Sequence, residues 1–275
     1  MMRSAVTIAL VPQIKTGPWI FWNDVESSMA KAAELGFDAI ELFTASADAI
    51  NPQQLQDLLS RYNLKLAAVG TGAGKVIHGL TLTDPDPTIR KKAASFISEM
   101  MDFAAEFGAP AIIGSMQGNV LAQGTSEQSL SWLSEGLEEL GEIAVSKDVF
   151  LIYEPLNRYE TNLLNTLQAA SEFVDGLQTK GVKLLADLFH MNIEETDLAK
   201  VIKDYGKHIG HVHFADSNRK PIGFGHTSMK PIALALQEIK YQGYVSAEAF
   251  PWPDPDAAAA QTIQSFRKYF RKQHT

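Results

Sequence analysis

The chain has 275 residues, with 24 Lys and Arg against 32 Asp and Glu, and a formal net charge of −8 at pH 7. This charge repels a phosphate backbone, so nucleic acid is not an expected partner. Cysteine is absent, which excludes disulfides and thiolate chemistry and restricts any metal site to oxygen and imidazole ligands.

The length suits either one large α/β domain or two average ones. No linker rich in Pro, Gly or Ser divides the chain, so we expect a single domain over residues 1–275. The apolar run at residues 5–11 is too short to span a membrane and lacks a convincing signal-peptide pattern. The sequence therefore predicts a cytoplasmic protein with no membrane partner.

Short apolar runs alternate with longer helical patterns along the whole chain. The predicted strands are residues 5–10, 38–43, 65–70, 110–114, 149–154, 182–187, 209–214 and 244–248. The first predicted helix follows Asn23, has Glu26 as a capping-box acid and stops at Gly36. The other predicted helices are 52–62, 87–107, 127–146, 166–177, 196–204, 229–239 and 256–270, the first two of which begin at a proline after Asn51 and Asp86.

This alternation predicts the fold class. Eight strand-then-helix units in a chain of this size are typical of an α/β protein with a single (β/α)₈ TIM barrel. An open, doubly wound parallel sheet is the structural alternative. In a barrel, chemistry collects at the face where the strands end and the following loops begin.

Four consecutive predicted strands end in a side chain that can bind a metal. These residues are Glu154, Asp187, His213 and Glu248, and His190 follows Asp187 in what we expect to be a loop. One strand-end acid often only caps the next helix, but a carboxylate at the end of an apolar strand needs a cation, a metal or many hydrogen bonds, and the recurrence favours a common site. Such a set suits Mn²⁺, Mg²⁺ or Co²⁺, with Zn²⁺ left open, and a bound ion can polarise a carbonyl and stabilise an enediolate.

Two loops on the same face need an interpretation. Residues 11–22 contain several aromatic side chains that form either an apolar wall over a small ligand or ordinary packing on the barrel rim. Residues 70–75 are glycine-rich and end in a lysine, but Val69 and Val76 stand where a phosphate loop requires Gly and Ser or Thr, and we expect no helix directly afterwards. The sequence therefore predicts an unphosphorylated substrate.

Three long motifs carry a family resemblance. They are IYEPLNRYETN (152–162), DLFHMNIEE (187–195) and HVHFADSNR (211–219), the last followed by GFGH (223–226). They resemble the ketose 3-epimerases, the tagatose and psicose 3-epimerase group of the xylose isomerase-like TIM barrels. The resemblance is strongest over residues 150–250, and its form is nearest the subgroup associated with epimerisation of 5-keto-gluconate-type sugar acids; a free ketohexose is the alternative substrate.

The resemblance implies an isomerase that inverts C3, the carbon next to the carbonyl, of a free ketose or keto-sugar acid through an enediolate. The implied ligands of one Mn²⁺-type ion are Glu154, Asp187, His213 and Glu248. Glu154 and Glu248 would also be the acid and base. The implied contacts to oxygens of the first two substrate carbons are Glu160, His190 and Arg219. The plainer interpretations are surface ion pairing for Glu160 and Arg219, and a contact at a helix start for His190.

Other functions stay open at this point. An aldose–ketose or hydroxypyruvate-type isomerase differs only in the carbon that loses its proton. An apurinic-site endonuclease shares the barrel, but it uses histidines on earlier strand ends and an Asp-x-His pair where this chain has His211-Val212-His213. A non-catalytic sugar-binding barrel would not need two glutamates at the metal.

Two segments depart from the better-known members of the family. Residues 11–22 and 249–256 are both expected to contact the end of the sugar that lies away from the metal. Because barrels of this family usually associate, we expect a homodimer or homotetramer. The apolar contact area would come from Trp19, Phe21, Trp22 and Trp252.

Overall fold

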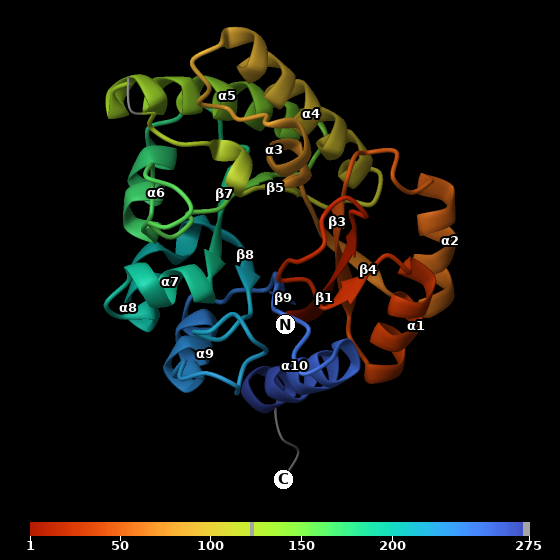
Figure 1. Ribbon diagram of the computed structural model, residues 1–275. Helices are drawn as coiled ribbons and strands as arrows, with labels where there is room; N and C mark the ends of the chain where they lie inside the picture. The colour runs from red at the N-terminus through yellow and green to blue at the C-terminus, as the bar shows by residue number, and fades with distance from the viewer. Residues whose placement is uncertain (122–123, 272–275) are drawn as a thin grey trace.

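A computed structural model describes residues 1–121 and 124–271 and confirms the predicted barrel. Its eight main strands are β1 (Arg3–Leu10), β3 (Ala39–Thr44), β4 (Lys65–Gly70), β5 (Ala111–Ile113), β6 (Leu151–Tyr153), β7 (Val182–Asp187), β8 (Ile209–His213) and β9 (Tyr244–Ala247). All neighbours pair in parallel, and pairing of β1 with β9 closes the sheet, which rules out the open alternative. Figure 1 shows these strands at the centre and the helices around them.

The eight predicted helices are all present in the outer layer. They are α1 (Val25–Leu35), α2 (Pro52–Tyr62), α4 (Pro87–Ala105), α5 (Ser126–Ser146), α6 (Leu167–Asp175), α8 (Leu198–Tyr205), α9 (Met229–Glu238) and α10 (Pro255–Phe270). Asn51 and Asp86 cap α2 and α4 as expected. The cap of α1 differs from the prediction, because the side chain of Asp24 accepts the Ser27 N–H while Glu26 pairs with Arg61 on α2.

Several short elements were not predicted. They are β2 (Phe21–Trp22), α3 (Ala73–His78), α7 (Leu188–Glu194), η1 (Ser115–Gln117) and η2 (Gly206–His208). The expectation that no helix follows the glycine-rich stretch was wrong, since α3 begins inside it. Gly74 in α3 lies so close to Met116 and Phe96 that a Cβ there would come within 3 Å of both side chains. Contacts with distant residues therefore stabilise a helix that local sequence does not favour.

An apolar layer inside the barrel lies beneath the carboxyl-terminal ends of the strands. Ala68, Ile112, Ile152 and Leu185 form a small apolar cluster. Side chains two positions apart lie on the same face of a strand. Each of these four residues lies two positions before the inward-facing residue at the carboxyl-terminal end of its strand. The polar strand ends therefore lie on an apolar layer at the carboxyl-terminal face. Within the described ranges, no helix is both long and apolar enough to cross a membrane.

Candidate active site

The four predicted metal ligands converge at the carboxyl-terminal face of the barrel. Glu154, Asp187, His213 and Glu248 are all buried, and each offers a ligand atom within 4.8 Å of the others. His213 Nδ1 is the common neighbour: it lies 3.2 Å from Asp187 Oδ2, 3.5 Å from Glu248 Oε2 and 3.6 Å from Glu154 Oε1. The register of β7 on β8 pairs Asp187 with His213 directly.

The hydrogen bonding of this cluster fits a bound cation. Glu154 Oε1 and His190 Nε2 are buried, lie 3.7 Å apart and find no hydrogen-bond partner among the described residues. Buried carboxylate oxygens are seldom left without a donor, and an ion is one ordinary explanation. Three carboxylates and one imidazole suit Mn²⁺, Mg²⁺, Co²⁺ or Zn²⁺ by donor type.

Burial and neighbouring charges shift the proton affinities of these groups. The pKa of Glu154 is raised to about 8: burial raises it most, His213 lowers it, and the negative charges of Glu248 and Asp187 raise it. Burial alone would lower the pKa of His213, but Glu41 and Glu248 together raise it well above its usual value. The cluster thus contains a carboxyl group that can carry a proton near neutral pH.

The three residues expected to hold substrate oxygens lie beside the four ligands. Arg219 Nη2 donates to Glu248, and Arg219 Nη1 lies 3.4 Å from Glu160 Oε1. His190 is buried on α7, not in a loop as predicted. Its Nδ1 accepts the backbone N–H of Asn157 at 3.3 Å, so the ring proton belongs on Nε2, the nitrogen that faces Glu154.

A buried aspartate shapes the loop that carries Arg219. Asp216 is 1% exposed, and its carboxylate accepts the backbone N–H groups of Ser217, Gly223 and Thr227 at 2.8–2.9 Å. Its carbonyl accepts the N–H of Arg219, which adopts a left-handed φ of 58°. This turn directs the guanidinium back towards Glu248 instead of leaving it in a surface ion pair.

A cavity of about 220 Å³ opens next to the cluster, and Glu154, Glu160, Glu248 and Arg219 line part of it. Trp19 and Phe43, whose rings lie 5.1 Å apart, belong to its apolar wall. The first loop therefore lines the cavity, whereas residues 249–256 are not among its lining residues, and their contact with the sugar stays a prediction.

The aromatic side chains expected at an interface separate into two groups. Phe21 is 6% exposed and belongs to the main core, so it cannot contribute contact area as predicted. Trp22 is half-buried and donates its indole N–H to the carbonyl of Trp19. Trp252 is 44% exposed and packs against Phe224.

Three residues near the site were missed from the sequence. Asn157 donates its side-chain N–H to Glu160 at 3.0 Å and contacts His190. Gly114 directly follows β5, at a position where a Cβ would lie 2.6 Å from Glu154 Oε2. Glu41 on β3 is fully buried, 3.0 Å from His213 Nε2. The available signal for Glu41 was a lone acid inside an apolar strand, Ala39–Thr44.

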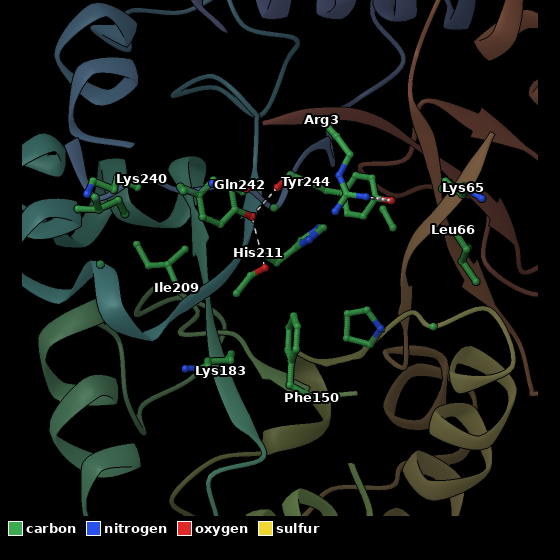
Figure 2. Close-up of a pocket in the computed structure, with 18 of the residues that line it drawn as sticks. Arg3, Lys65, Leu66, Phe150, Lys183, Ile209, His211, Lys240, Gln242 and Tyr244 are labelled. Atoms are coloured by element: carbon green, nitrogen blue, oxygen red, sulfur yellow. Dashed lines mark hydrogen bonds between the residues drawn. The ribbon is translucent and has the colours of Figure 1, made fainter. Parts of the chain in front are cut away.

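Another cavity, of about 670 Å³, lies at the opposite end of the barrel, where the strands begin. Figure 2 shows Arg3, Lys65 and Lys183 around it, with His211 and Phe150 between them. None of the seven predicted site residues lines it. The smaller cavity at the carboxyl-terminal face is therefore the candidate active site.

Comparisons with known proteins agree with the fold. Residues 29–269 match the family described as a xylose isomerase-like TIM barrel. The D-psicose 3-epimerase of Ruminiclostridium cellulolyticum is 31% identical over 240 residues, 82% of this chain and 78% of the relative. The 3-dehydro-D-guloside 4-epimerase of Escherichia coli is 36% identical over 128 residues, 45% of this chain and 49% of the relative.

Solved structures give the same result. The D-psicose 3-epimerase of Clostridium cellulolyticum, solved with D-tagatose, superimposes with a TM-score of 0.80 and 25% identity, and the match covers 99% of this chain and all of the other. The matches in fold and in sequence lead to one conclusion: the chain belongs to the xylose isomerase-like TIM-barrel family and is a carbohydrate epimerase of the isomerase class.

Proposed function

We propose that the protein inverts C3, the carbon next to the carbonyl, of an unphosphorylated ketose or keto-sugar acid, and that it requires a divalent ion. The observation that supports this most is the pair Glu154 and Glu248, both buried and both within 3.6 Å of His213 Nδ1. Because β7 and β8 separate β6 from β9, the two carboxylates approach this centre from different directions. Inversion of a carbon needs a base and an acid that act on opposite faces.

The proposed metal ligands are Glu154, Asp187, His213 and Glu248, and Mn²⁺ is the ion we expect, ahead of Co²⁺, Mg²⁺ and Zn²⁺. A bound ion would supply Lewis-acid charge at the substrate carbonyl and the neighbouring hydroxyl. The unpartnered buried oxygen of one of these ligands, Glu154 Oε1, supports this assignment.

In the proposed reaction one glutamate removes the proton from C3 and leaves an enediolate, and the other returns a proton to the opposite face. The guanidinium of Arg219 supplies positive charge beside the developing oxyanion, and His190 Nε2–H donates to a substrate oxygen. The two glutamates exchange roles when the reaction runs backwards.

A second regiochemistry has support of its own. The Escherichia coli relative, 36% identical over 128 residues, is named as a 4-epimerase of a 3-dehydro sugar, so its name also puts the inverted carbon beside the oxidised one. The same two-glutamate arrangement would serve a substrate whose ketone is at C3. Aldose–ketose isomerisation is a further alternative, because it differs in which carbon loses its proton.

Product analysis tests this proposal. Metal-stripped protein would be incubated, with and without Mn²⁺, with free ketoses, 5-keto-sugar acids, 3-keto-glycosides and phosphorylated ketoses, and the products identified by NMR. We expect a C3 epimer of a free ketose or keto acid to form only with the metal. A C4 epimer would favour the second regiochemistry, and an aldose would favour the isomerase. Full turnover by metal-free protein, or a large preference in kcat/KM for a phosphorylated ketose, would contradict the proposal.

We also propose that the chain acts in the cytoplasm as one domain that assembles into a homodimer or homotetramer. Phe224, Phe250 and Trp252 are 37–44% exposed near the rim of the barrel and offer apolar contact area in place of the buried Phe21. Sedimentation velocity at micromolar concentration should detect the oligomer. A monomer throughout that range would refute the assembly.

A further inference from the structure

We propose that Glu41 is a positioning residue, which holds the imidazole of His213 in the tautomer and orientation that direct Nδ1 to the metal. This inference rests on the metal site of the proposed function. It assigns a role to a carboxylate on the first half of the barrel, the half that carries none of the proposed ligands.

Glu41 reaches His213 across the interior of the barrel. It lies in the middle of β3, and β1 and β9 separate β3 from β8 in the sheet, so the contact does not come from strand pairing. Glu41 is 0% exposed, Glu41 Oε1 lies 3.0 Å from His213 Nε2, and Glu41 Oε2 lies 2.6 Å from His211 Nε2. Each oxygen of the carboxylate therefore contacts one imidazole.

These contacts determine which nitrogen of each ring carries hydrogen. An ionised carboxylate only accepts hydrogen bonds, so both Nε2 atoms must be donors. With its hydrogen on Nε2, the neutral ring of His213 presents the lone pair of Nδ1 to Asp187, Glu154 and Glu248, which lie 3.2–3.6 Å away. Metal-binding histidines commonly donate their other ring N–H to a carboxylate, which fixes the ring and strengthens the ligand.

His211 completes the arrangement from the other side of Glu41. Its side chain is 1% exposed, and it borders the cavity at the amino-terminal end of the barrel, as Figure 2 shows. Because His211 donates a hydrogen bond to Glu41 Oε2, it holds the Glu41 carboxylate in the orientation in which Oε1 accepts a hydrogen bond from His213 Nε2. His211 cannot reach the metal ligands through this contact, so its effect on metal binding must pass through Glu41.

The alternative is a second metal ion bound by Glu41, His211 and His213, which also lie within ligand distance of one another. Both carboxylate oxygens of Glu41 are at hydrogen-bond distance from an imidazole nitrogen. In His213, Nε2 faces Glu41 and Nδ1 faces the proposed metal ligands, so the ring has only one nitrogen for each of the two sites. A second ion would require His213 to bridge two metals as an imidazolate. The geometry favours hydrogen bonds, and stoichiometry separates the two possibilities.

The experiment measures Mn²⁺ binding to the metal-stripped full-length protein, using the EPR signal of free Mn²⁺. The variants are Glu41→Gln, Glu41→Leu and His211→Gln. Leu137→Ala is the control, because Leu137 is fully buried on α5 outside the barrel and its loss destabilises the fold without removing a contact to His213. Circular dichroism and thermal unfolding confirm that each variant is folded at the measuring temperature.

We expect one Mn²⁺ per wild-type chain. Loss of a carboxylate behind a metal-binding histidine weakens metal affinity by about 10- to 100-fold, so we expect Glu41→Gln near the lower value and Glu41→Leu near the upper. His211→Gln should weaken binding in the same direction by less. Leu137→Ala should lower the unfolding temperature and leave the Mn²⁺ affinity unchanged.

The possible failures are distinguishable. If the wild-type protein binds Mn²⁺ but both Glu41 variants bind it within about twofold of wild type, the positioning role is wrong and the proposed function stands. Two ions per chain in the wild type and one in Glu41→Leu would replace the positioning role with a second metal site. A wild-type protein that turns over its substrate without binding any divalent ion overturns the metal site itself.

Discussion

The two halves of the barrel contribute different things to the same site. The four proposed ligands end strands β7 and β8 or directly follow β6 and β9, whereas β4 ends in Gly70, and Gly114 directly follows β5. The first half instead supplies space and an apolar wall, including Trp19 and Phe43. Under the proposed function, the second half of the barrel reacts with the substrate, and the first half shapes the cavity that holds it.

The largest effect is expected from substitutions that remove the reactive groups of the second half of the barrel. Glu154→Gln and Glu248→Gln each keep the side-chain volume and remove one path for a proton, so epimerisation should fall by about 10²–10⁴-fold in each. At least one variant should still exchange the C3 hydrogen with deuterated solvent without inversion, because one glutamate remains. Initial rates and NMR of the recovered substrate measure both quantities.

Two results would contradict this two-glutamate mechanism. One is near-normal epimerisation in both variants. The other is wild-type product, formed at low conversion in deuterated water, that carries no deuterium at the inverted carbon.

The next prediction tests whether the first half of the barrel affects the reactive groups of the second half only through the space that it leaves for them. In Gly114→Ala the new Cβ would lie 2.6 Å from Glu154 Oε2, so the carboxylate must move. Since a displacement of about 1 Å can cost about 100-fold in rate, we expect a loss of kcat of about that size. Gly72→Ala is the matched control on the same cavity, since its Cβ would meet Ser115 Oγ at an ordinary 3.4 Å and should change kcat little. Equal losses in both variants would remove the special role of Gly114.

A smaller effect concerns the loop that holds Arg219. In Asp216→Asn the amide keeps one acceptor oxygen but turns an NH₂ group towards backbone N–H donors, so a buried donor loses its partner. We expect a loss of about 1–3 kcal/mol in the free energy of unfolding, measured by urea denaturation.

The pH dependence of this loss has a defined sign. Burial alone would raise the pKa of Asp216, but the N–H groups of Thr227, Gly223 and Ser217 lower it below its usual value. Its contribution to stability is therefore present above about pH 4 and disappears as the pH falls through the lowered pKa. The gap between wild type and Asp216→Asn should narrow in acid, and a gap that widens there would exclude this account.

The smallest expected effect concerns the apolar wall of the cavity. Trp19→Ala removes a ring that lines the cavity without touching the proton path, so KM should rise by about tenfold while kcat changes little. Trp132→Ala is the control, because Trp132 on α5 stacks with Arg90 outside the lining of this cavity and should leave KM unchanged. A fall in kcat with constant KM for Trp19→Ala would assign that ring to catalysis.

Much of this site was predictable because the relevant signals are local. Glu154 ends an apolar run at a proline, and Asp187 and Glu248 also end apolar runs, so the sequence predicted the strand ends and the proposed ligands together. His190 was placed in a loop because the helix that carries it has only seven residues and begins where the carboxylate of Asp187 accepts the N–H groups of Phe189 and His190. A helix that short has no periodicity to detect.

The sequence by itself determined the barrel, its strand order and the set of side chains at the carboxyl-terminal face. It could do so because the periodicity of apolar residues and the capping residues are local signals that extend over a few positions. Parallel strands joined by helices can also close into only a few topologies. Only the tertiary structure decided that His213 turns Nδ1 to the carboxylates while Nε2 meets Glu41, and that Gly114 leaves room for Glu154. Glu41 and His213 are 172 positions apart on strands that do not pair. Closure of the barrel creates that contact, and no local pattern records it.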